Sequence, residues 1–124
     1  MNDARVYLLH IRDAVGRIER YASGGRAAFI AETMIQDAIV RNLEIIGEAV
    51  KQLPESVRAQ RPEIPWRRIA GMRDILVHHY FGVKLDAVWM VVEQELKPLA
   101  AAVDGLLSAQ PSRGLSNPPA AGSE

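Results

Sequence analysis

Cysteine is absent from the 124 residues of this chain, which excludes disulfide bonds, thiolate nucleophiles and thiolate metal ligands. This absence is typical of proteins in a reducing environment, so we expect a cytoplasmic location. Long apolar runs are also missing: no stretch approaches the roughly 18 residues that suggest a membrane span. Residues 1–13 lack the uninterrupted apolar core of a signal peptide. We therefore expect no membrane association.

An excess of positive charge is missing too, because 15 Lys and Arg residues are balanced by 15 Asp and Glu residues. A function in binding nucleic acid therefore cannot rest on a bulk positive field, and any affinity for phosphates must be local. The segment 58–73 is a local candidate, since it contains one acid, Glu63, and several arginines: Arg58, Arg61, Arg67, Arg68 and Arg73. The simpler interpretation is a solvated helix surface.

Apolar residues, in contrast, make up 48% of the chain, which is enough for the core of one domain. They recur at spacings of three and four, the period of amphipathic helices. We expect four long helices at about 2–24, 27–53, 65–81 and 86–107, a short helical connector at 54–65, and a kink at Pro98. The fold class is then all-α, an antiparallel bundle of four to five helices.

The expected domain covers residues 1–108. Residues 109–124 lose the apolar periodicity and are rich in Pro, Gly and Ser. Because such a composition cannot bury enough apolar surface to offset the entropy of ordering, we expect a disordered tail.

A charged stripe follows the helix expected at 27–53, formed by Asp37, Arg41, Glu44, Glu48 and Lys51. The simpler interpretation is a solvated face with ion pairs one turn apart, each worth a few tenths of a kcal/mol. The sharper one is that Glu44 and Glu48 line a polar cleft. Gly47 lies between them at a cost of about 1 kcal/mol relative to Ala, which suggests that another backbone comes close.

The most specific candidate site is the octapeptide RDILVHHY at residues 73–80. Arg73 offers a planar fork of donors matched to phosphate, and His78 can exchange protons near neutrality. These two are the candidate catalytic residues. Asp74, one turn before His78, could fix its tautomer, and Tyr80 supplies a hydroxyl. In the simpler interpretation the same residues form ordinary helix contacts, and His79, nearer the apolar stripe, is a packed histidine.

Helical geometry restricts how this site can work. With about 100° per residue, Arg73 and His78 diverge by about 140° and cannot converge on one phosphate from a single regular helix. Either the helix loosens before Gly82, or two copies of the chain assemble the site about a two-fold axis. The second alternative predicts a homodimer.

A metal site is a weaker candidate. The chain has three histidines, of which His10 is remote from the octapeptide. His78 and His79 are adjacent, whereas a helical zinc site uses histidines four residues apart. We expect no metal and no other cofactor.

The order of Arg73, Asp74, His78 and Tyr80 resembles the motif of the HEPN superfamily. Three longer segments in the same order are similar to the HepT family, whose members are HEPN toxins paired with a minimal nucleotidyltransferase antitoxin: RNLEIIGEAVKQL, PEIPWRRIAGMRDILVHHYFGV and LDAVWMVVEQEL. The resemblance covers nearly all of the chain up to about Leu107. It departs from the family at His79, where a small residue such as Gly is common.

This resemblance implies an α-helical homodimer whose cleft combines the motif from both subunits. It implies that Arg73 holds the scissile phosphate of RNA and that His78 is the acid/base residue in metal-independent cleavage by the 2′-hydroxyl. Tyr80 matches the tyrosine that the nucleotidyltransferase antitoxin AMPylates in a type VII-like toxin–antitoxin system. The alternative function is a non-catalytic helical subunit that docks to the nucleotidyltransferase and oligomerises with it.

Overall fold

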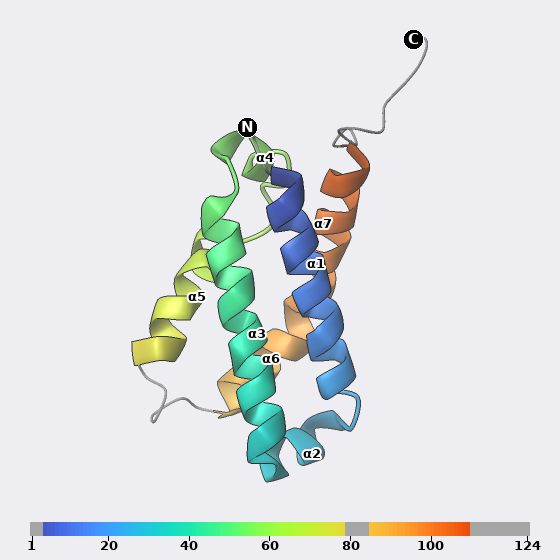
Figure 1. Ribbon diagram of the computed structural model, residues 1–124, viewed down its shortest axis with the longest axis vertical. Coiled ribbons are helices and arrows are strands. Elements are labelled where there is room, and N and C mark those ends of the chain that lie inside the picture. The colour runs from blue at the N-terminus through green and yellow to red at the C-terminus, as the bar shows by residue number, and fades with distance from the viewer. Residues whose placement is uncertain (1–3, 79–84, 110–124) are drawn as a thin grey trace.

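The computed structural model describes residues 4–78 and 85–109, with the side chains of residues 73–78 excepted. Every regular element in these ranges is helical, which confirms the all-α fold class (Figure 1). The helices are α1 (Ala4–Tyr21), α2 (Gly25–Ala31), α3 (Thr33–Gln52), α4 (Glu55–Arg58), α5 (Trp66–His78), α6 (Leu85–Gln94) and α7 (Leu96–Ala109). Of the predicted tail at 109–124, Ala109 is the last residue of α7, and residues 110–124 lie outside the described residues.

The long helices α1 and α3 run antiparallel and form the centre of the bundle (Figure 1). Helix α5 packs against α3, and α7 packs against α1. At one end α2 crosses between α1 and α3 and contacts α6, while α4 caps the other end. No helix within the described ranges combines the length and the apolar character needed to cross a membrane.

The core is made of the apolar stripes that the sequence predicts. On α1 the buried positions include Leu8, Ile11, Val15 and Ile18, each three or four residues from the next. The stripes of α3 and α7 are buried in the same way, at Ile39, Leu43, Ile46 and Val50 and at Leu99, Val103 and Leu106. Removal of these side chains from water is the main force that holds the helices together.

The single helix expected at 27–53 is two helices, because regular helix is interrupted at Glu32. The backbone of Glu32 is extended, with φ −118° and ψ 109°. The side chain of Gln36 donates hydrogen bonds to the carbonyl oxygens of Phe29, at 3.0 Å, and Ile30, at 3.1 Å. These carbonyls at the end of α2 would otherwise lack partners, so Gln36 stabilises the break.

The predicted kink near Pro98 is confirmed as a separation of α6 from α7 at Glu95. Proline has no N–H to donate to the carbonyl of Gln94, and its ring crowds that carbonyl. Regular helix therefore stops at Gln94 and resumes at Leu96. The break turns α6 across the lower part of the bundle in Figure 1, while α7 continues beside α1.

Candidate active site

Positions 73–78 of the predicted motif lie on α5, and Trp66 holds the start of this helix in place. The indole is buried, and its Nε1 donates hydrogen bonds to the carbonyl oxygens of Arg58, at 3.1 Å, and Arg61, at 2.9 Å. These carbonyls belong to α4 and to the connector that follows it. Ile69, nearly one turn after Trp66, is also buried, and α5 packs against α3. The N-terminal half of α5 thus sets the direction of the helix.

The backbone of α5 is helical as far as His78, so Arg73, Asp74 and His78 all lie within one helix. Arg73 and His78 therefore diverge by about 140° around its axis. The first geometric alternative was a helix that loosens before Gly82. As far as His78, the backbone of α5 shows no such loosening. The side chains of all three residues, and the whole of Tyr80 and His79, lie outside the described part of the chain. Their predicted contacts stay predictions.

The charged stripe of α3 is mostly exposed, as the simpler interpretation predicts. Within it, Oε1 of Glu44 lies 4.0 Å from Nη1 of Arg41, and the Glu44 side chain is 22% exposed. Glu48 is exposed, whereas Gly47 beside it is buried. Helix α3 packs against α5. A cleft lined by Glu44 and Glu48 stays a prediction, since it involves the undescribed side chains of α5.

Two arginines of the segment 58–73 are paired with carboxylates. Nη2 of Arg58 lies 3.2 Å from Oε1 of Glu55 within α4. Nη2 of Arg68 lies 2.9 Å from Oε2 of Glu95, at the break between α6 and α7. Surface pairs of this kind add little stability, about 0–1 kcal/mol. Their main effect is to occupy two of the positive charges in the segment.

Arg67 differs from both, because it is exposed and forms no hydrogen bond or ion pair with any residue that the structure describes. Next to it is a surface hollow of about 500 Å³. Charged residues lining the hollow are Glu55, Arg58 and Arg67, and its apolar lining includes Ile64 and Trp66. The charge of Arg67 is thus available to a ligand.

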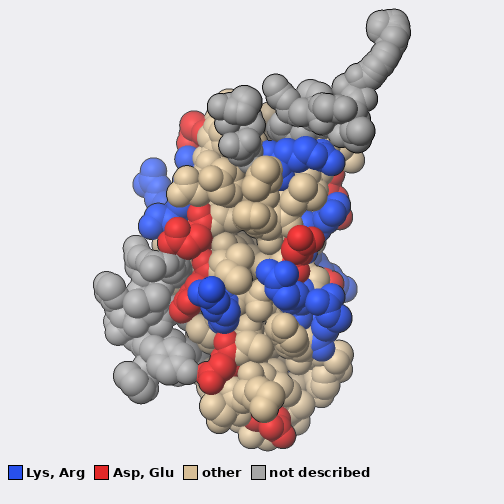
Figure 2. All heavy atoms as spheres, in the orientation of Figure 1, with Lys and Arg blue, Asp and Glu red and all other residues tan. Residues whose placement is uncertain are grey.

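Charge on the visible face of the molecule is mixed. In Figure 2, Lys and Arg side chains alternate with Asp and Glu side chains over the coloured residues. This distribution agrees with the balanced composition of 15 basic and 15 acidic residues. Binding of an anionic polymer to this protein would depend on a few placed cations and not on the overall field.

Among the side chains that the structure describes, in residues 4–72 and 85–109, no three His, Asp or Glu side chains are arranged so that they could hold a metal ion. His10 is exposed and packs edge-on against Tyr7, with ring centroids 6.0 Å apart. His10 is therefore a surface aromatic contact of α1.

Two contacts that position the site were not foreseen in the sequence. A buried indole N–H usually finds an acceptor, but the sequence does not indicate that Trp66 donates to the carbonyl oxygens of Arg58 and Arg61. Arg26 of α2 forms an ion pair with Asp86 at the start of α6, and residues so far apart in sequence give no signal of such a pairing. Together these contacts fix the start of α5 and the start of α6.

A family model described as "HepT-like: Ribonuclease HepT-like" matches residues 11–106. The chain is 41% identical over 108 residues to a protein of Caldanaerobacter subterraneus subsp. tengcongensis named "Putative RNase", a match that covers 86% of this chain and 96% of that protein. It is 40% identical over 94 residues to a "Probable ribonuclease HepT" of Thermococcus cleftensis, covering 75% of this chain and 86% of that protein.

A further relative is longer than this chain. The protein of Methanocaldococcus jannaschii named "Gamma-glutamylcyclotransferase and putative RNase" is 42% identical over 98 residues, which are 78% of this chain and 44% of that protein. The match therefore spans less than half the length of that relative. No solved structure matches the chain significantly.

Proposed function

The chain belongs to the HepT-like ribonuclease family, and on this premise we propose that it is an endoribonuclease and the toxin of a type VII-like toxin–antitoxin system. The observation that carries the proposal is the family match, because the matched residues 11–106 contain the whole motif of Arg73, His78 and Tyr80. The relatives named as ribonucleases support the same reaction class.

In the proposed reaction the 2′-hydroxyl of one ribose attacks the neighbouring phosphorus. The bond from the 2′-oxygen to phosphorus forms, the bond from phosphorus to the 5′-oxygen breaks, and a 2′,3′-cyclic phosphate and a 5′-hydroxyl result. As the acid/base residue, His78 takes the proton of the 2′-hydroxyl and gives a proton to the departing 5′-oxygen, a role usually worth about 10²- to 10⁴-fold in rate. Arg73 stabilises the charge that develops on the phosphate oxygens. Asp74 orients His78, and no metal takes part.

The helical backbone of α5 supports a site shared between two subunits. Arg73 and His78 lie on one regular helix and diverge by about 140°. A two-fold axis near α5 would bring Arg73 of one copy to the same phosphate as His78 of the other. We therefore propose a homodimer with two equivalent composite sites. Glu44 and Glu48, on the helix that packs against α5, are the candidates to line the cleft.

Regulation would act at Tyr80. A partner nucleotidyltransferase would join the Tyr80 oxygen to the α-phosphorus of ATP, forming an AMP ester and releasing pyrophosphate. The attached AMP is bulky and anionic, so it would block the cleft and repel the phosphates of RNA. The alternative is that the chain binds the nucleotidyltransferase without cleaving RNA, in which case Tyr80 serves only as a docking or modification site.

The test is expression of the chain alone, followed by growth and by total RNA. We expect growth arrest and RNA breakdown with the unaltered protein and neither with His78→Ala or Arg73→Ala. His10→Ala is the matched control, because it removes an exposed histidine of α1. If His78→Ala is as toxic as the unaltered chain, or if both are harmless, nuclease action through His78 is wrong and the binding-subunit alternative stands.

Intact-mass measurement after co-expression with the nucleotidyltransferase tests the regulation separately. We expect AMP-sized increments that disappear in Tyr80→Phe. A tight complex without any such increment would mean that the partner neutralises the toxin by steric blocking alone.

A further inference from the structure

We propose that the hollow between α4 and α5, with Arg67 at its edge, binds RNA backbone phosphates a few nucleotides away from the bond that is cleaved. The inference rests on the proposed ribonuclease function, because it names the part of this chain that holds the substrate on one side of the cleavage site. It concerns residues outside the motif: Arg58, Arg67, Gly71 and Lys51.

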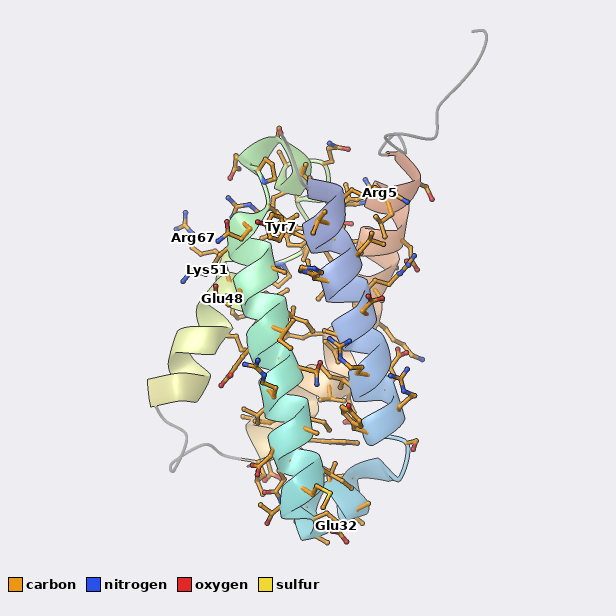
Figure 3. All side chains as sticks on the ribbon, in the orientation of Figure 1. Arg5, Tyr7, Glu32, Glu48, Lys51 and Arg67 are labelled. Atoms are coloured by element: carbon orange, nitrogen blue, oxygen red, sulfur yellow. The ribbon has the colours of Figure 1, made fainter. Side chains whose placement is uncertain are left out.

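Arg67 is the first reason. Its neighbour Arg68 is bound to Glu95 at 2.9 Å, whereas Arg67 is exposed and has no partner among the described residues. Lys51 of α3 is also exposed, and Figure 3 shows Lys51 and Arg67 at the same edge of the view, where α3 and α5 pack together. Glu48 lies at this edge as well. Unpaired Arg and Lys side chains can bind the phosphates of a nucleic-acid backbone.

The hollow itself is the second reason. It holds about 500 Å³ and presents Arg58 and Arg67 beside the apolar surface of Trp66 and Ile64. Nε of Arg58 is buried and has no hydrogen-bond partner among the described residues, while its Nη2 is held by Glu55 at 3.2 Å. Trp66 is buried, so the groups that the hollow offers to a ligand are the two guanidinium groups, and guanidinium groups bind the phosphates of single-stranded RNA.

The third reason is the direction of α5. With about 100° per residue, positions 71, 74 and 78 lie within about 40° of position 67 around the helix axis. The rise of about 1.5 Å per residue places positions 67 and 78 about 16 Å apart along the axis. A stripe therefore leads from Arg67 to the position of His78, long enough for several nucleotides.

Gly71 has no side chain, so the backbone of α5 is accessible at this position of the stripe. A Cβ built at Gly71 would have no described atom within 4 Å, so the position opens to free space. Glycine costs about 1 kcal/mol in a helix relative to alanine, and packing does not explain it at this position. A strand of RNA passing from Arg67 toward His78 could approach the backbone of α5 there. Asp74 is the acidic position of the stripe, and its proposed role beside His78 places it at the cleavage site.

Binding is measured with a short fluorescein-labelled RNA of mixed sequence that is fully 2′-O-methylated, so that the 2′-hydroxyl attack cannot occur. We expect Arg67→Ala to weaken binding about three- to tenfold and to lower the slope of log affinity against log salt by about 0.7, the value for one phosphate contact on a single strand. Arg12→Ala is the matched control, since Arg12 is exposed on α1 and has no partner among the described residues. Its affinity should stay within about twofold of the unaltered protein.

Two further variants separate phosphate binding from a merely structural role. Glu55→Gln frees Arg58, so we expect about twofold tighter binding. Gly71→Glu and Gly71→Gln place side chains of nearly equal size on the stripe. We expect the Glu variant to bind about fivefold more weakly than the Gln variant at low salt, with the difference shrinking as salt rises. Thermal unfolding by circular dichroism checks that all variants are folded.

The proposal is overturned if Arg67→Ala and Arg12→Ala bind RNA equally well, if Gly71→Glu and Gly71→Gln do not differ, or if the unaltered protein does not bind the RNA. Failure of the proposed function gives another result: an unmethylated RNA would then be cleaved equally by His78→Ala and unaltered protein, or by neither. For Arg67→Ala we expect a raised KM for cleavage with kcat nearly unchanged, because the residue contacts RNA away from the reacting atoms.

Discussion

Nε of Arg17 on α1 donates a 2.7 Å hydrogen bond to Oδ1 of Asn42 on α3, and Asn42 is the one buried polar residue in the described part of the chain. The amide nitrogen of Asn42 in turn donates to the carbonyl of Ala38 at 2.9 Å. The pair joins the two central helices at a defined register, because the hydrogen bond forms only when Arg17 and Asn42 lie opposite each other. Apolar contacts alone are less specific.

Asn42→Ala should lower the free energy of unfolding by about 1–3 kcal/mol, since it removes a partly buried hydrogen bond between α1 and α3. The double variant Arg17→Met, Asn42→Leu should regain most of this loss, because both partners become apolar together. Urea unfolding followed by circular dichroism measures both. Gln52→Ala, exposed on the same helix, is the control. A cost of Asn42→Ala no larger than that of the control would contradict the structural role of this pair.

The same Trp→Phe substitution should have different costs at the two tryptophans. Nε1 of Trp66 donates to two carbonyl oxygens, whereas Nε1 of Trp89 is buried with no partner among the described residues. Trp66→Phe should therefore cost about 1–2 kcal/mol more than Trp89→Phe. In the unaltered protein the ring centroids of Trp89 and Phe29 lie 5.3 Å apart, and the new ring in Trp89→Phe keeps this contact. Equal midpoints in thermal unfolding would show that the indole hydrogen bonds add nothing.

Gly25 and Gly71 should respond to alanine in opposite directions. Gly25 has φ 87°, a left-handed conformation that costs other residues about 1–2 kcal/mol. Gly71 lies in the middle of α5 with open space around the position of a Cβ. Gly25→Ala should thus destabilise the protein by about 1 kcal/mol or more, and Gly71→Ala should stabilise it by about 0.5–1 kcal/mol. Chemical unfolding of the two variants in parallel gives the sign of each effect.

A composite site predicts complementation between inactive subunits. Arg73→Ala and His78→Ala should each abolish RNA cleavage as homodimers. In the mixed dimer, one of the two sites combines the intact Arg73 of one subunit with the intact His78 of the other, so activity should return to about half. Mixing after partial unfolding and refolding, followed by an RNA cleavage assay, measures this. An inactive mixture that contains mixed dimers by native mass spectrometry would place both residues in one subunit.

The sequence predicts the core of this protein well, because helical spacing alone determines which residues face inward. Leu8, Ile11, Val15 and Ile18 are buried as expected. The break at Glu32 was missed since it depends on Gln36, a side chain four residues later that binds the last carbonyls of α2. Local periodicity continues through the break and gives no sign of it.

For the candidate site, too, the sequence predicts some features and not others. The resemblance to the HEPN motif predicts phosphate cleavage by Arg73 and His78, and their spacing predicts that a single regular helix cannot bring both to one phosphate. Neither gives information on which arginines are already paired. Arg67 and Arg68 are adjacent and chemically identical, yet Glu95 occupies only Arg68. That difference arises from tertiary contacts between α5 and the break after α6, which a sequence does not display.

Gly105 on α7 has a consequence for the order in which the protein matures. Nη2 of Arg61 lies 2.5 Å from the point where a Cβ of residue 105 would be, so the arginine rests directly on the glycine of α7. Arg61 also supplies a carbonyl that holds Trp66 at the start of α5. During synthesis α7 emerges from the ribosome after α5. A nascent chain therefore has α5, which carries the proposed catalytic residues, before it has α7, on which the connector to α5 rests, and we expect activity to appear only after α7 has docked.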